Sequence, residues 1–147
     1  RDTAMKNTLS SISFFVAICI IAYIFYSNYR AHVLWTDNDV EKRITVGQIT
    51  SFNTNNSNKH RVTYQFTVND EVFVSYHTIR EYLTTQSRDS VKACVGKKFQ
   101  VLFILKDPGY SELLIGEPVA KGTPAPPGNG WSVEYVRLGF KDWEPIR

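Results

Sequence analysis

Residues 62–78 read VTYQFTVNDEVFVSYHT and carry the strongest structural signal in the chain. From Val62 to Val68, apolar residues alternate with threonine and glutamine, which is the period of a half-buried β-strand. Residues 71–78 alternate in the same way, and Asn69-Asp70 between the two segments is a two-residue turn signal. The stretch therefore predicts a β-hairpin.

Other strand signals lie on both sides of the hairpin. Residues 44–52 predict a first strand, followed by the polar turn cluster 53–59 (NTNNSNK). Residues 79–93 are polar with few apolar positions, which predicts a loop with one helical turn at Arg80–Leu83. Lys98–Leu105 (KFQVLFIL) is apolar on both faces, as in a strand crossing the middle of a closed sheet.

The last strand is expected at Ser111–Ile115 (SELLI), after a turn at Asp107-Pro108-Gly109-Tyr110 in which proline presets φ. Five short, mostly antiparallel strands are best buried by curling the sheet. The fold class predicted for residues 44–115 is therefore all-β, a small five-stranded SH3-like or OB-like barrel.

Residues 116–147 change in composition to a Pro/Gly-rich linker followed by an aromatic tail. The tail is too aromatic to be purely disordered, so it either folds back onto the barrel or docks on another chain. Fold-back is favoured, because a free WSVEYVRLGF segment would expose an aggregation-prone strand.

The run Leu9–Tyr29 (LSSISFFVAICIIAYIFYSNY) has no charged residue and predicts a single transmembrane helix. A helix of this length reaches about 30 Å, the thickness of a hydrocarbon core. A cleaved signal peptide is the main rival, with Arg1 and Lys6 as its basic region, but bulky aromatics replace the small-residue cleavage site. The expected interfacial belt consists of Tyr23, Tyr26, Tyr29, Arg30 and Trp35.

The predicted division of the chain has five parts. They are an N-terminal flank (1–8), the span (9–29), a neck (30–43), the barrel (44–115) and the linker with its tail (116–147). Basic residues flank both ends of the span, so their count does not decide its orientation.

Catalytic and metal-binding patterns are not recognised in the sequence. His32, His60 and His77 have no second ligand at metal spacing, and neither a phosphate-binding loop nor a nucleophile elbow is present. Cys19 and Cys94 give no disulfide framework, and Cys94 is interpreted as a small buried hydrophobe. The net charge of +3 is spread along the chain, unlike a nucleic-acid-binding face. We therefore expect neither an enzyme nor a cofactor, metal or nucleic-acid site.

Part of the sequence resembles an uncharacterised family of small bacterial membrane proteins with one or two spans and a compact β-domain. The resemblance covers residues 46–119, and its motifs are Val46-Gly47-Gln48-Ile49, VTYQF and VNDE at 62–71, VGKKF at 95–99, Asp107-Pro108 and SELL at 111–114. Asp70 stands where the family more often has glycine, so the turn type is left open. The resemblance implies the inner membrane of a bacterium, single-pass, with the β-domain in the periplasm.

Two functions are compatible with these observations. The first is an accessory or structural subunit of a larger envelope membrane complex, with the bilayer and other membrane-protein subunits as partners. Candidate positions for packing of the span are Ser10, Ser13 and Ala17. The alternative is a periplasmic binding module that recognises a peptide or envelope ligand through a barrel edge or face. The candidate docking residues are Leu102, Ile104, Trp131, Tyr135, Phe140 and Trp143.

Overall fold

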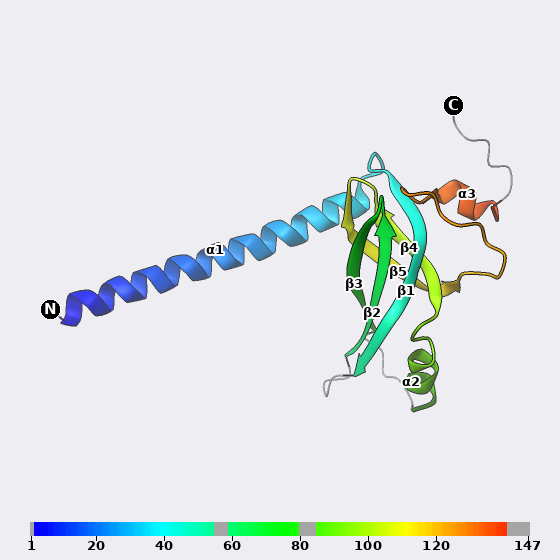
Figure 1. Cartoon of the computed structure of the whole chain (residues 1–147). Coiled ribbons are helices and arrows are strands. Elements are labelled where there is room, and N and C mark those ends of the chain that lie inside the picture. Colours follow the sequence, from blue (N-terminus) through cyan, green and yellow to red (C-terminus); the bar gives the residue numbers. More distant parts are fainter. Residues whose placement is uncertain (1, 55–58, 80–84, 141–147) are drawn as a thin grey trace. The chain divides into compact units, whose positions relative to one another are not determined.

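The computed structural model describes residues 2–54, 59–79 and 85–140, with side chains from residue 15 onward. Its two compact units are Arg1–Asp39 and Val40–Arg147. The first unit is built on one long helix and the second on a β-sheet (Figure 1).

The first unit is the helix α1 (Asp2–Thr36), so the apolar run is helical throughout, as predicted, and its helix continues into the predicted neck. Among the helices whose side chains are described, none is long and apolar enough to cross a membrane. The side chains of residues 9–14, which belong to the predicted span, lie outside that part of the chain. The structure thus does not bear out the single span, which stays a prediction.

The second unit is mostly β. Its elements are β1 (Lys42–Thr54), β2 (His60–Val68), β3 (Glu71–Ile79), α2 (Thr85–Lys92), β4 (Lys98–Ile104), β5 (Asp107–Pro118), β6 (Trp131–Ser132) and α3 (Val133–Arg137). The antiparallel sheet has the order β3-β2-β1-β4-β5, and β6 pairs with β1. The predicted hairpin is confirmed by the β2–β3 register, in which Phe66 lies opposite Phe73.

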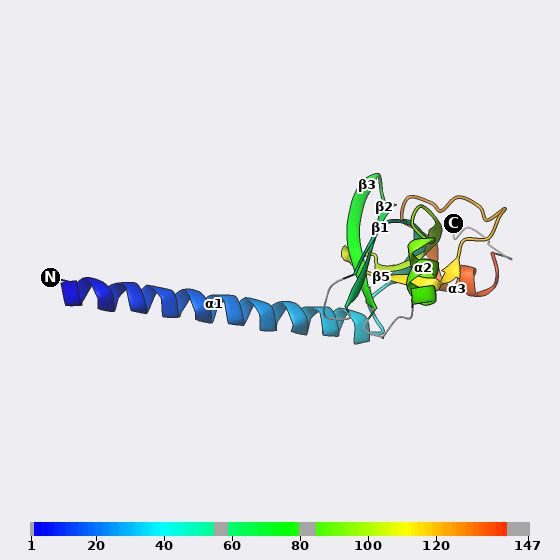
Figure 2. The ribbon, with the colours of Figure 1, turned by 90° about the horizontal axis from the view of Figure 1, so that it is seen from below.

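The sheet curls into a half-barrel around one apolar core (Figure 1 and Figure 2). Along β2 the alternate side chains from His60 to Val68 are buried, as the period of two predicted. Gly47 on β1 faces this core, and a Cβ there would come within 2.5 Å of Val101 Cγ2 on β4. The absence of a side chain at position 47 thus allows β1 and β4 to pack closely.

The predicted closed barrel is corrected to an open one. Within the described residues no ladder joins the end strands β3 and β5, although the curl brings them near each other. Across the interior, the Tyr64 hydroxyl on β2 is 2.9 Å from Ser111 Oγ on β5. A buried tyrosine hydroxyl needs such a partner, and this one links the two walls of the half-barrel.

The polar segment after β3 was predicted as a loop, but it contains α2. This helix has no buried residue, and only Val91 within it and Cys94 just after it pack against the core. One apolar contact in the helix is too few to produce apolar residues that recur every three to four positions, which is the pattern that identifies a helix in a sequence. The helical turn predicted at residues 80–83 lies outside the described residues.

The predicted turn at residues 107–110 was also wrong. The chain turns at Leu105-Lys106, and β5 already begins at Asp107, opposite Ile104 across an irregularity in the register. Pro108 lies within this irregularity and has no cross-strand partner on β4, so its missing N–H removes no ladder bond from this edge strand.

The aromatic tail folds back onto the sheet, which was the favoured of the two options. Trp131 of β6 lies opposite Ile44 of β1, and its ring packs edge-on against Phe140 with the centroids 5.0 Å apart. The tail is further held by Arg43, whose Nη1 donates to the Gly130 carbonyl at 3.5 Å. The Ser132 hydroxyl caps α3 by accepting from the Tyr135 N–H.

Gly130 is the tightest point of this fold-back, and Gly130→Ala should lower the free energy of unfolding by about 2–3 kcal/mol. Its φ is +76°, and a Cβ there would lie 2.8 Å from the Ile44 carbonyl oxygen and 2.9 Å from the Phe103 ring. The left-handed conformation alone costs an L-residue about 1–2 kcal/mol, and the overlap adds to that. Urea unfolding followed by tryptophan fluorescence measures the change.

The matched control is Gly122→Ala, because Gly122 also has a positive φ (+88°) but no heavy atom within 4 Å of the added Cβ. It should lose about 1 kcal/mol from backbone strain alone. Equal losses in the two variants would contradict the close approach of the tail to β1.

Candidate functional site: a groove on the outer face of the sheet

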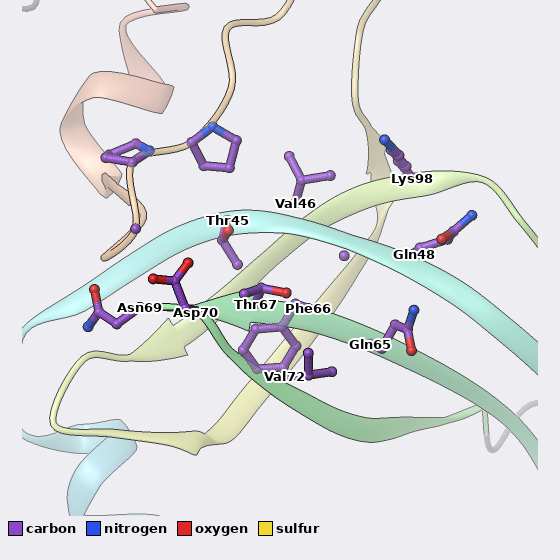
Figure 3. A pocket seen from close by; sticks show the side chains of 14 residues that line it. Thr45, Val46, Gln48, Gln65, Phe66, Thr67, Asn69, Asp70, Val72 and Lys98 are labelled. Carbon is purple, nitrogen blue, oxygen red and sulfur yellow. The ribbon is translucent and has the colours of Figure 1, made fainter.

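The second unit has a groove of about 520 Å³ on the outer side of β1 and β2, shown from close by in Figure 3. Pockets that bind ligands typically enclose about 300–1,000 Å³. The groove is lined by Thr45, Val46, Gly47, Gln48, Gln65, Phe66, Thr67, Asn69, Asp70, Val72, Lys98, Pro126, Pro127 and Gly128.

The sheet register places three of the polar side chains in one row across the strands. Gln48 of β1 lies opposite Gln65 of β2 on one side and opposite Lys98 of β4 on the other. Directly opposite residues in a sheet point to the same face, so this row belongs to the outer surface. The Gln48 amide is held in place because its Nε2 donates to the Gly96 carbonyl at 2.9 Å.

The other end of the groove is formed by the β2–β3 turn. Asn69 and Asp70 both have positive φ, 48° and 65°, which identifies the I′ type and answers the question that the sequence left open. The Asn69 N–H donates to the Gly128 carbonyl at 2.7 Å, and Pro126 and Pro127 precede this contact. The turn thus pins a proline-rich strap, residues 126–128, beside the sheet (Figure 3).

An exposed apolar stripe continues from the groove along β3. Val72 belongs to both, and it is followed on the same face by Val74 and Tyr76. These three side chains are 61%, 67% and 58% exposed. The Arg61 guanidinium on β2 lies over the Tyr76 ring, 4.3 Å from its centroid. Contiguous exposed apolar surface of this kind typically marks a place where a partner binds.

The predicted membrane residues lie on α1, which belongs to the first unit. Tyr23, Tyr26 and Tyr29 are exposed, as is Ala17, whereas Trp35 is half-buried. The side chains of Ser10 and Ser13 lie outside the described residues. Arg30 has an interaction partner within the chain.

The predicted docking face at Leu102 and Ile104 is covered, so it is not available as an open surface. The register places both residues on the same face as Ile44 and Trp131. Ile104 is fully buried and Leu102 is half-buried. Of the other docking candidates, Tyr135 and Phe140 pack edge-on against each other within the tail (centroids 5.4 Å apart), and Trp143 lies outside the described residues.

Among the described residues, the Tyr64 phenol has a shifted pKa. Burial raises the pKa of the Tyr64 phenol above its ordinary value of 10.0, while hydrogen bonds with Ser111 and Ser75 oppose the rise. Within the described ranges, no three His, Cys, Asp or Glu side chains are grouped closely enough to hold a metal ion. Cys94 is half-buried, and its Sγ donates to the Ser90 carbonyl.

His60 is the one buried histidine of the described part, and His60→Phe should raise the free energy of unfolding by about 1 kcal/mol. The residue is 1% exposed, its ring stacks on Phe52, and neither ring nitrogen has a hydrogen-bond partner in the structure. An unsatisfied buried polar group costs about 1–3 kcal/mol, and an apolar ring of similar shape removes that cost. Thermal melting of the two proteins measures the difference.

The control for this change is His77→Phe on β3, where the side chain is only half-buried. Its effect should stay within about 0.5 kcal/mol, as for most surface substitutions. A loss of stability in His60→Phe would show that the imidazole makes a polar interaction that the folded protein needs.

Sequence reasoning missed the groove because its residues come from four strands and from a segment nearly thirty positions beyond them. The glutamines at positions 48 and 65 looked like ordinary surface residues of two strands, and only their register makes them neighbours. The one sequence signal for this surface was the alternation of Val72, Val74 and Tyr76 along the strand. The sequence did not show whether these residues face the core or the solvent.

Comparison of the chain with protein-family models, with curated proteins and with solved structures found no match.

Proposed function

We propose that this chain is an accessory subunit of a larger membrane complex, anchored by α1 and docking to its partners through the β-domain. The observation that carries the proposal is the surface of α1, whose large apolar side chains are exposed on all sides of the helix. They include Phe15 (68%), Ile20 (54%), Tyr23 (72%), Ile24 (51%), Phe25 (71%) and Tyr29 (70%). A helix that is apolar all round is stable only inside an apolar environment, which a bilayer or a membrane-embedded partner supplies.

The location in a bacterial inner membrane, with the β-domain on the periplasmic side, rests on the family resemblance. For the β-domain we propose an OB-like rather than an SH3-like barrel. The strand order β3-β2-β1-β4-β5 and the helix between β3 and β4 support this choice, as does the partly open seam.

Membrane fractionation tests the anchor. The full-length chain, expressed in a bacterium, should stay in the membrane pellet after washing with alkaline carbonate and should be released by detergent. Recovery of the chain in the carbonate supernatant would overturn the proposal. Native mass spectrometry of the detergent extract then tests the second half, since a chain that is monomeric and free of partners would contradict a subunit role.

The second candidate function is a binding module that acts through a face of the β-domain. The exposed stripe of Val72, Val74 and Tyr76 favours it, because the stripe is continuous with a groove of ligand-binding size. The two functions are compatible, since the groove is a place where the accessory subunit can hold its partner.

A further inference from the structure

We propose that the groove binds an extended peptide segment of a partner protein, with a basic group at the Asp70 end and a carboxylate at the Lys98 end. The proposal names the partner chemistry of the docking function above and rests on that function. It does not depend on what surrounds α1.

The dimensions of the groove fit a short extended chain. Lys98, Gln48, Gln65 and Val74 form a continuous row of cross-strand neighbours over four strands. Within the groove this row runs from Lys98 to Gln65, two strand spacings of about 4.8 Å. Asp70 lies past the end of β2, which is three residues, or about 10 Å, along the strand from Gln65. The diagonal from Lys98 to the end of β2 is therefore about 14 Å, the length of about four extended residues.

The middle of the groove offers hydrogen-bonding groups that match a peptide backbone. Gln65 is exposed, and its side-chain amide has no partner among the described residues, so it presents both a donor and an acceptor. Gln48 uses one amide hydrogen on Gly96 and keeps its Oε1 as an acceptor. An extended peptide presents N–H and C=O groups in alternation, which these two amides can meet side by side.

The walls of the groove are apolar and suit alternate side chains of such a peptide. Val46 and Val72 line the groove from the sheet (Figure 3), and Pro126 and Pro127 of the strap also belong to its lining. Beyond Val72, the exposed Val74 extends this apolar surface. A strand-like peptide places every second side chain on one face, and so it would bury apolar residues here.

The charges of the groove favour a peptide over a nucleic acid. Asp70 and Lys98 are the ionisable side chains among the lining residues, and Figure 3 shows them at opposite ends. Single-stranded nucleic acid needs a basic groove with aromatic platforms, whereas this groove has no net charge and its one aromatic ring, Phe66, is buried. Two opposite charges at separate ends instead match a segment with a basic residue at one end and an acidic residue at the other.

The test uses three dye-labelled, end-capped hexapeptides that share the core Ser-Val-Ser-Val. The first has lysine and glutamate at its two ends, the second two lysines and the third two glutamates. Fluorescence anisotropy with the full chain in detergent micelles should show the lysine/glutamate peptide binding tightest, by about fivefold, which is the size of one exposed ion pair. The assay is done in detergent, so failure of membrane anchoring does not affect it.

Variants at the two charged ends should change the preference in opposite directions. Lys98→Glu should favour the two-lysine peptide, and Asp70→Asn should bring the lysine/glutamate and two-glutamate peptides within about twofold of each other. Asn tolerates the positive φ at position 70, so this variant keeps the turn. The control is Lys97→Glu, which makes the same charge change next to Lys98 but outside the groove, and it should keep the wild-type order.

Four results would overturn the proposal. Three come from the peptides: no saturable binding of any of them, equal affinity of the wild type for all three, or the same change of preference in Lys97→Glu as in Lys98→Glu. The fourth is tight binding of an oligothymidine probe that Lys98→Glu abolishes, which would assign the groove to nucleic acid.

Discussion

The double variant Ile18→Lys/Ile21→Lys is expected to release this chain from membranes into the alkaline carbonate supernatant. Both isoleucines lie near the middle of the run Leu9–Tyr29 and are about half exposed on α1 (45% and 53%). A lysine at the centre of a transmembrane helix costs about 3 kcal/mol, so the pair should cost about 6 kcal/mol of insertion free energy. That is enough to convert a retained chain into a released one.

The control adds the same two charges at the end of the run, as Ser27→Lys/Asn28→Lys. Lysines there can extend their ammonium groups to the headgroup region, and the chain should stay in the pellet. The β-domain is a separate compact unit, so its tryptophan fluorescence and thermal melting should be the same in both variants. Retention of the Ile18→Lys/Ile21→Lys variant in the pellet would contradict an anchor at this position.

The parts of the fold that the sequence predicted are those where burial and local period agree. On β2 every second side chain is buried, so the alternation of apolar and polar residues in the sequence matches the alternation of buried and more exposed side chains in the strand. Lys98–Leu105 was predicted as an interior strand because it is apolar on both faces, and β4 (Lys98–Ile104) indeed lies between β1 and β5. In both strands the environment of each residue follows from its place along a single segment.

The parts that escaped prediction depend on contacts between distant segments. Within the helix α2, only Val91 packs against the apolar core, so the apolar pattern of the helix is too sparse to detect. The start of β5 at Asp107 is set by pairing with Ile104, which overrides the proline-glycine turn signal. The groove needs the register of Gln48 with Gln65 and the contact of Asn69 with Gly128. The residues next to each of these positions in the sequence do not indicate which distant residue it contacts.

Trp131→Ala is expected to lower the free energy of unfolding of the β-domain by about 4 kcal/mol, as large-to-small changes of buried tryptophan do. The side chain is 2% exposed and lies opposite Ile44, on the face that also holds the fully buried Ile104. Removing the indole opens a cavity there and deprives the Phe140 ring of its edge-on partner. Urea unfolding monitored by far-ultraviolet circular dichroism measures the loss, since the variant lacks the main fluorescent reporter.

Leu138→Ala provides the matched control, because Leu138 is an apolar residue of the same tail but is 52% exposed. Its effect should stay within about 0.5 kcal/mol. Hydrogen exchange locates the damage: in Trp131→Ala the amides of residues 43–44 and 131–132 should lose protection before those of the β2–β3 hairpin. A Trp131→Ala protein as stable as Leu138→Ala would mean that the tail does not pack on the sheet. Residues 126–128, the strap beside the groove, come just before β6 in the chain, so the strap would then lose the support of the tail.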